Sequence, residues 1–207
     1  MLPEEKRIKS KADLNEFLAA DLVHYRPHPL KYFLRYGESS LLKRHQILLR
    51  KTEFYLNTGK KLREFIFKFR LIKFQTRYGI HIPLNCCGKG LHIMHLAPIS
   101  VNRKATLGEN VSLHACTQIV AGGSNNLVPT IGNNVIVGVG AVVLGGVTIA
   151  DNIAIGANSV VNKSFVEPSI TIAGVPAKKI SDHGTEVWKK EAEPTQVLEK
   201  RSNEQGV

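Results

Sequence analysis

The sequence predicts a mainly β protein: a parallel β-helix with an α-helical cap before it and a polar tail after it. Three features support this fold class. An aliphatic residue recurs at every sixth position between Leu107 and Ala177, helical periodicity precedes residue 79, and polar residues dominate after residue 181. The expected divisions are the cap at 1–78, the β-helix at 79–181 and the tail at 182–207, partly helical near Trp188 or disordered.

The six-residue spacing fits neither an amphipathic helix nor an alternating strand. It fits a β-helix, because each coil turns aliphatic side chains inward and stacked coils share one core. Gly or Ala often follows the aliphatic residue, and a small or β-branched residue often takes the fifth place. We therefore expect an inward ladder made of Leu107, Leu113, Ile119, Ile131, Val137, Val143, Ile149, Ile155 and Val161.

Four helices are expected in the cap. The first covers Ser10 to His24, with Ser10 as N-cap and an acidic residue three positions later. A short second helix covers 30–36, before Gly37. The third begins near Ser39 or Ser40 and ends near Leu56, and the fourth covers 60–78.

The fourth helix has an apolar stripe and an excess of positive charge. The stripe consists of Leu62, Phe65, Ile66, Phe69 and Ile72. Such a helix could lie on an anionic bilayer or collect an anionic, lipid-linked glycan. The more ordinary interpretation is that the stripe packs against the β-helix or a neighbouring subunit while the charges are solvated.

Composition limits the partners. The 207 residues include 28 Lys and Arg against 17 Asp and Glu, a formal net charge of +11, which favours a phosphorylated cofactor, an anionic glycan or an anionic membrane. No nucleic-acid module is recognisable, so we expect no nucleic-acid partner. Cys86, Cys87 and Cys116 occur without a signal peptide or an 18-residue apolar run, so we expect free thiols, small apolar filler, in a cytoplasmic protein.

One insertion interrupts the repeat. The spacing between Ile119 and Ile131 is twelve rather than six, so the segment 121–129 must leave the coil as a loop. Long excursions from a solenoid usually serve function rather than fold.

The repeat units, the close Ile172-Ala173-Gly174-Val175-Pro176-Ala177, the segment Gly90 to His95 and the pair Asn162-Lys163 resemble a known group. They are similar to the left-handed β-helix acyltransferases of the hexapeptide-repeat superfamily, most closely the serine acetyltransferase branch and its relatives in surface-polysaccharide synthesis. The resemblance covers about residues 79 to 181. It implies acetyl-CoA as co-substrate, no metal, and a homotrimer, because coenzyme A lies in the groove between two β-helices.

Acyl transfer from a thioester to a hydroxyl needs a base, and imidazole suits this role near neutral pH. His95 occupies the position that matches the catalytic base of the serine acetyltransferases. His114 is the second candidate, because related glycan acetyltransferases have a histidine at a similar place, and it could assist from a neighbouring subunit. His81 and His92 are interpreted as surface or satisfied histidines.

The resemblance also places the coenzyme A site. Small residues leave room for the pantetheine arm, and lysine suits phosphate as a point charge. The alternative is that the small residues only permit tight coil corners. The matching positions are Gly138, Val139, Gly140, Ala141, Gly156, Ala157, Asn162, Lys163, Lys178 and Lys179.

Two positions depart from the serine acetyltransferase pattern. The inserted loop has Leu127-Val128-Pro129 where that branch has Arg-His-Pro, whose histidine helps to hold the amino-acid acceptor. The β-helix begins with Gly79-Ile80-His81 in place of Asp-Ile-His, whose Asp orients the catalytic imidazole. A backbone carbonyl or Glu109 is therefore expected to orient His95.

The sequence thus favours an acetyl-CoA-dependent O-acetyltransferase acting on a sugar hydroxyl in capsular or exopolysaccharide synthesis, possible contact with a membrane-linked glycan included. The alternative acceptor is serine, which would give O-acetylserine for cysteine synthesis. A metal-binding β-helix such as a γ-type carbonic anhydrase would need three interface histidines, and the coils after His114 contain none. A non-catalytic scaffold is disfavoured by the presence of His95.

Overall fold

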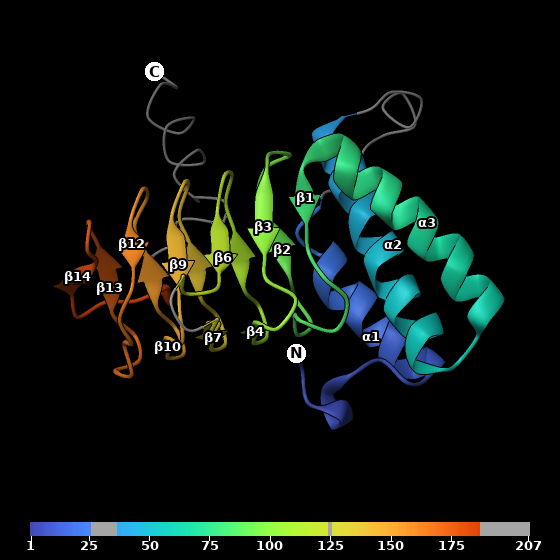
Figure 1. Cartoon of the computed structure of the whole chain (residues 1–207), viewed down its shortest axis with the longest axis horizontal. Helices are drawn as coiled ribbons and strands as arrows, with labels where there is room; N and C mark the ends of the chain where they lie inside the picture. The colour runs from blue at the N-terminus through green and yellow to red at the C-terminus, as the bar shows by residue number, and fades with distance from the viewer. Residues whose placement is uncertain (26–36, 124–125, 187–207) are drawn as a thin grey trace, which may run out of the picture.

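The computed structural model describes residues 1–25, 37–123 and 126–186. An α-helical cap lies at one end of an elongated parallel β-helix, and the strands follow one another along the long axis in chain order (Figure 1). The expected fold class is therefore confirmed.

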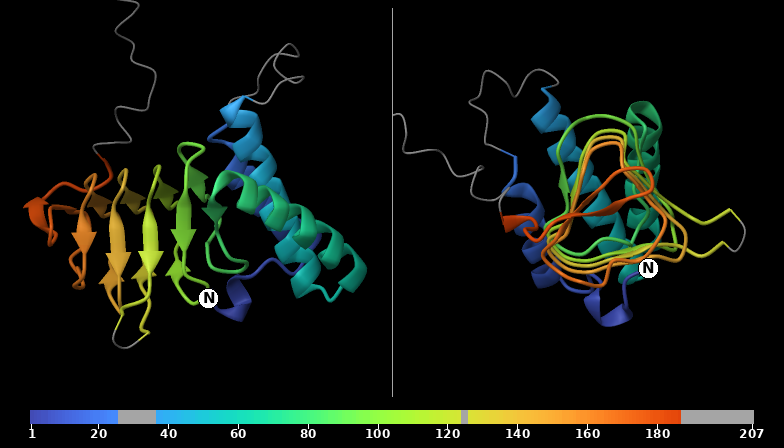
Figure 2. Two further views of the ribbon diagram at one scale, coloured as in Figure 1. Left: turned by 45° about the horizontal axis from the view of Figure 1, so that its top comes forward. Right: turned by 90° about the vertical axis from the view of Figure 1, so that its left-hand side faces the viewer.

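Three sheets form the sides of the β-helix, and the cross-section is roughly triangular (Figure 2). The first sheet contains β1 (Ile80–His81), β3 (Ile99–Val101), β6 (Gln118–Val120), β9 (Val142–Leu144) and β12 (Val160–Val161). The second contains β4 (Thr106–Leu107), β7 (Thr130–Ile131) and β10 (Thr148–Ile149). The third contains β2 (His92–Ile93), β5 (Ser112–Leu113), β8 (Ile136–Val137), β11 (Ala154–Ile155), β13 (Thr171–Ala173) and β14 (Lys178–Ser181).

The pairing register explains the spacing of six. Ile131 pairs with Ile149 and Val137 with Ile155, so a regular coil returns after 18 residues, six for each side. All nine expected ladder residues are buried, none more than 2% exposed. The inward ladder is confirmed, and it forms one continuous apolar core. The segment 121–129 leaves the coil as predicted, and its described part projects from the cross-section in Figure 2.

Asparagines turn one row of corners. Asn110, Asn134 and Asn152 have φ values of 55°, 54° and 60°, a left-handed conformation that Asn tolerates better than most residues. The side-chain amide of Asn110 donates to Asn134 at 3.1 Å, and that of Asn134 donates to Asn152 at 3.0 Å. Hydrogen bonds between stacked corners therefore add to the apolar ladder.

The cap contains α1 (Lys11–Leu22), α2 (Glu38–Asn57) and α3 (Lys61–Tyr78), after a 3-10 turn η1 (Glu4–Lys6). Ser10 and Asp13 form the expected capping box at α1. The third expected helix begins at Glu38 rather than at Ser39 or Ser40. The short helix predicted at 30–36 lies outside the described residues.

A buried charge cluster fixes the cap to the first coil. Arg50 of α2 donates to Asp21 of α1 at 2.7 Å, to Glu53 at 3.0 Å and to the backbone carbonyl oxygens of Cys87 and Gly88 at 2.9 and 2.6 Å. Burial disfavours its charge, but the two carboxylates raise the pKa of Arg50 above its ordinary value. A buried guanidinium with such complete hydrogen bonding is well satisfied.

Asp21 connects the same cluster to the β-helix backbone. Its Oδ1 accepts from the backbone amides of Gly90 and Leu91 at 2.8 and 3.0 Å. The hydroxyl of Tyr25 accepts from the amide of Ile93 at 3.1 Å. The irregular first coil is thus held by polar side chains of the cap.

The apolar stripe of α3 does not pack against the β-helix of its own chain. Leu71 and Phe74 face inward instead and are buried. The five stripe residues are between 44% and 74% exposed. That part of the ordinary interpretation is wrong because α3 is apolar on two faces; packing against a neighbouring subunit stays a prediction.

The expected boundary at residue 181 coincides with the end of β14, which pairs antiparallel with β13. Beyond it, Thr185 is buried and its amide donates to the carbonyl oxygen of Asn152 at 3.1 Å. The predicted helix near Trp188 lies outside the described residues. Cys86 and Cys87 are buried filler, whereas Cys116 is exposed. Within the described ranges, no helix is long and apolar enough to cross a membrane.

Candidate active site

The corner that follows the third sheet gathers most of the predicted site residues. Ile93, Leu113, Val137 and Ile155 pair in consecutive coils. The turns after them, 94–98, 114–117, 138–141 and 156–159, therefore stack along one edge, here called the histidine corner. His95 and His114 lie on it at the cap end, and the glycine turns follow.

His95 and His114 are neighbours in this stack. Their ring centroids are 6.5 Å apart, and the side chain of His95 is 58% exposed. Partial burial, and then the nearby His95, lower the pKa of His114 below its ordinary value. His114 is therefore held neutral at the pH where an imidazole can accept a proton.

Glu38, the first residue of α2, lies against His95. Its Oε1 is 3.5 Å from Nδ1 of His95 and accepts from the backbone amide of Leu96 at 2.6 Å. The amide bond fixes the carboxylate beside the ring, and a carboxylate facing Nδ1 favours a proton on that nitrogen. Nε2 of His95 is then left with a free lone pair.

Glu109 does not take the expected orienting role. Its carboxylate lies 3.9 Å from the ammonium of Lys89, and its backbone amide donates to Asn133 at 2.8 Å. The acidic partner of His95 comes from the cap instead. Sequence reasoning missed Glu38 because 57 residues separate it from His95 and nothing local connects them.

His92 is a satisfied, mostly buried histidine, as expected. It stacks on His24 of the chain after α1, with ring centroids 4.1 Å apart. Burial, and then the neighbouring histidines, lower the pKa of His92 to about 3. His81, on β1, is exposed. Neither residue lies with a free imidazole on the site edge.

The glycine turns of the histidine corner stack very closely. A Cβ on Gly138 would lie 2.6 Å from the carbonyl oxygen of Ile155, and one on Gly156 would lie 2.8 Å from Cβ of Ala173. Gly140 has a φ of 68°. These glycines are thus required by coil stacking, and Val139 and Ala157 between them are exposed. The result is a smooth edge without large side chains.

The remaining predicted positions lie elsewhere. Asn162 and Lys163 are exposed at the corner after the first sheet, the corner from which the inserted loop also leaves. Lys178 is exposed on β14. Lys179 is bound to Glu167 and Asp182, both at 2.6 Å, so phosphate would have to compete with two carboxylates for it. Lys163 and Lys178 fit a phosphate group better.

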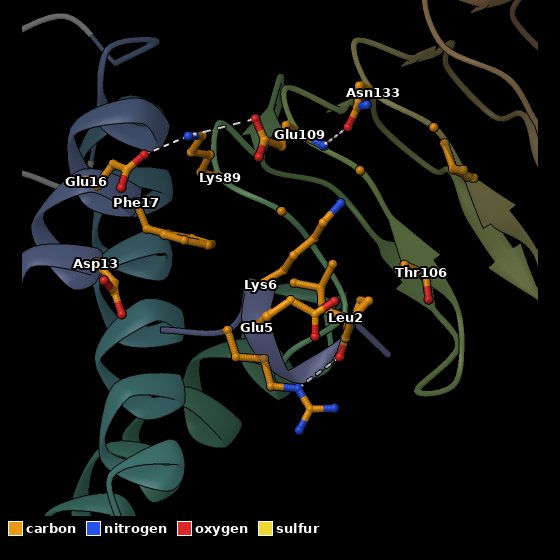
Figure 3. A pocket seen from close by; sticks show the side chains of 16 residues that line it. Leu2, Glu5, Lys6, Asp13, Glu16, Phe17, Lys89, Thr106, Glu109 and Asn133 are labelled. Carbon is orange, nitrogen blue, oxygen red and sulfur yellow. Dashed lines mark hydrogen bonds and ion pairs between the residues drawn. The ribbon is translucent and has the colours of Figure 1, made fainter. Parts of the chain in front are cut away.

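A separate pocket of about 480 Å³ lies at the corner after the second sheet, between the N-terminal segment, α1 and the first coils (Figure 3). Lys89 links Glu16 at 2.6 Å and Glu109 at 3.9 Å across its rim. The lining contains none of the predicted site residues. Acidic and basic side chains are mixed there, which gives it no clear preference for an anionic ligand.

Metal ligation has no support in the described ranges 1–25, 37–123 and 126–186. No group of three or more His, Cys, Asp and Glu side chains lies there with a geometry that could hold an ion.

Comparison with known proteins gives the class. No protein family model matches the chain. A serine acetyltransferase of Staphylococcus aureus is 34% identical over 122 residues, 58% of this chain and 56% of that protein. One from Buchnera aphidicola is 36% identical over 128 residues, 60% of this chain and 46% of that protein.

Solved structures agree. A serine acetyltransferase from Brucella abortus superposes with a TM-score of 0.64 at 22% identity, covering 84% of this chain and 71% of that chain. One from Neisseria gonorrhoeae superposes with a TM-score of 0.61 at 27% identity, covering 89% and 73%. The fold is that of the left-handed β-helix acyltransferases of the hexapeptide-repeat superfamily.

Within that superfamily, the chain resembles the serine acetyltransferases. It spans about half the length of the curated relatives that it matches.

Proposed function

We propose that the protein is an acetyl-CoA-dependent O-acetyltransferase whose acceptor is L-serine. The observation that carries this proposal is His95, an exposed imidazole on a smooth β-helix edge whose Nδ1 faces a fixed carboxylate. This is the arrangement of a general base, since the second nitrogen remains available to a hydroxyl.

The similar proteins support acetyl-CoA as the donor. One solved serine acetyltransferase of this fold, at a TM-score of 0.60, is a complex with CoA. The N. gonorrhoeae enzyme, 27% identical, has been solved in complex with serine. The small-residue edge from Gly138 to Ala157 and the exposed Lys163 and Lys178 fit a pantetheine arm and phosphates.

The proposed chemistry uses one proton and one bond exchange. Nε2 of His95 accepts the proton of the acceptor hydroxyl, and the oxygen attacks the carbonyl carbon of the thioester. The carbon–sulfur bond breaks, and the imidazolium of His95 returns the proton to the departing thiolate. Glu38 stabilises the transient imidazolium and keeps the ring in position. The histidine assignments, like the donor residues, remain part of this proposal.

The acceptor is the finer choice. The names of the relatives favour serine over the sugar acceptor that the sequence alone suggested. Leu127-Val128-Pro129 in the inserted loop still differs from the Arg-His-Pro of that branch. Serine would therefore have to be held by other groups near His95, and His114 is one of them.

A homotrimer remains part of the proposal, because a groove between two β-helices needs two walls. In that assembly His95 of one subunit would face the glycine turns of the next. The expected mass in solution is three times 22.9 kDa.

Thiol release tests the acceptor. Purified full-length protein is incubated with acetyl-CoA and either L-serine or a panel of sugars and nucleotide sugars, and free CoA is measured with a thiol reagent. We expect release with L-serine and little with the panel. Release with a sugar and none with serine would overturn serine as acceptor while retaining acetyl transfer. No release with any acceptor would contradict the proposed reaction.

A further inference from the structure

The outer face of α3 is an exposed apolar stripe. It consists of Leu62, Phe65, Ile66, Phe69 and Ile72, which are 74%, 70%, 44%, 61% and 53% exposed. Their spacing follows the helical repeat, so the five side chains form one continuous strip. In both views of Figure 2, α3 lies at the outside of the cap, at the end of the molecule away from β14.

This stripe is not the face that holds α3 in the fold. Leu71 and Phe74 are buried, and Phe67 packs against the core cluster. At about 100° per residue, these side chains point away from the stripe, on the opposite side of the helix. The helix is therefore anchored by one apolar face and presents a second one to the surroundings.

Two rows of cations border the stripe. Lys61 and Lys68, seven residues apart, lie along one edge, and Arg63, Arg70 and Arg77, also seven apart, lie along the other. All five are exposed. The helix contains six basic residues against one acidic residue, Glu64, which already lies within 4.0 Å of Lys61 and 3.8 Å of Lys68.

These charges decide what can cover the stripe. A second copy of the chain docking α3 on α3 would bring two basic rows together without carboxylates to pair with them, and like charges across an interface oppose docking. A polyanion such as nucleic acid would match the charges but leave five apolar side chains in water. An anionic lipid surface satisfies both, because the stripe enters the acyl boundary while the cations meet the head groups.

We propose that α3 is a membrane-contacting helix that holds the cap end of the protein on an anionic lipid surface. The helix lies in the interface and does not cross it, in keeping with the absence of a membrane-spanning helix within the described ranges. This attachment is independent of acetyl transfer and of the identity of the acceptor.

Vesicle flotation tests the proposal. The full chain is mixed with vesicles of phosphatidylcholine containing about 30% phosphatidylserine and with vesicles of phosphatidylcholine alone, since the surface potential comes from the anionic lipid. We expect flotation with the anionic vesicles only, and its loss near 1 M salt, where the Debye length is about 3 Å. No flotation, or equal flotation with neutral vesicles, would overturn the proposal.

Two variants separate the contributions. Phe65→Ser with Phe69→Ser should reduce partitioning about tenfold or more, because two exposed aromatic rings no longer enter the bilayer. Arg63→Ser with Arg70→Ser should reduce it by a similar factor. The matched control, Val166→Ser, removes a side chain that is 75% exposed near the far end of the β-helix and should float like the wild type.

The same variants test a second copy as occupant. Light scattering without lipid should give the same mass for the wild type and for Phe65→Ser with Phe69→Ser. A lower mass for the variant would show that the stripe is covered by another subunit and would overturn the proposal. Wild-type flotation of this variant, with its circular dichroism unchanged, would also overturn it.

Discussion

The β-helix and the helical cap are held together by different chemistry. The β-helix repeats one apolar ladder and one set of corner hydrogen bonds, so each coil resembles the next. The cap is attached through single, non-repeated polar contacts, above all Arg50 with Asp21. The difference teaches that the site depends on both, because the catalytic histidine lies on the repetitive part and its carboxylate on the other.

The largest expected effect concerns the buried charge cluster. Arg50→Met leaves Asp21 and Glu53 buried without their partner, so we expect the free energy of unfolding to fall by about 3–5 kcal/mol. Urea unfolding followed by circular dichroism measures it. Arg50→Lys, which keeps a charge, should lose less. A loss below about 1 kcal/mol in Arg50→Met would mean that the cluster does not hold the cap.

Acid should weaken the cap next. Burial, and then the charge of Arg50, lower the pKa of His45 to about 3. The unfolded chain therefore binds this proton more readily, so the stability is full above about pH 6.5 and is lost as the pH falls toward 3. Between pH 6.5 and 5 the loss should be about 2 kcal/mol from this group.

His45→Leu isolates that contribution. The variant should show a flatter dependence of unfolding free energy on pH over this range, while the part due to His92 remains. An unchanged slope would show that His45 is not the responsible group.

Glu38 joins the two regions. Glu38→Gln can still accept from the amide of Leu96 but loses the charge beside His95, so we expect kcat to fall about tenfold with the KM for acetyl-CoA unchanged. Glu38→Asp should retain part of the rate. Equal kcat for Glu38→Gln and the wild type would show that the contact only attaches the cap.

The smallest effect lies in a corner of the β-helix. Asn134→Ala and Asn134→Gly lose the same side-chain hydrogen bonds, but only Ala strains a backbone with a φ of 54°. We expect the Ala variant to be about 1 kcal/mol less stable than the Gly variant, measured by urea unfolding. Equal stabilities would mean that the corner relaxes.

Regular parts of the molecule could be predicted from the sequence because their cause is local. A period of six residues places Ile131 and Ile149 on the inward ladder, whatever lies around them. The capping box of α1 likewise depends on Ser10 and Asp13 alone. Positions on the histidine corner follow from the same periodicity, since the register repeats every 18 residues.

Contacts between distant segments could not be predicted. The pairing of Glu38 with His95 and of Asp21 with Arg50 depends on how the cap docks, which no short pattern encodes. The direction of α3 was equally hidden, because Phe69 and Phe74 lie on opposite apolar faces of one helix. Only packing decides which face is inside.

The most direct test of the account is the turnover of His95→Ala with saturating acetyl-CoA and L-serine. We expect kcat to fall by about 100-fold or more, because no other group on the histidine corner faces a fixed carboxylate in the described structure. The control His81→Ala removes an exposed histidine of β1 and should keep the wild-type rate. Wild-type turnover of His95→Ala would contradict the assignment of His95 as the base.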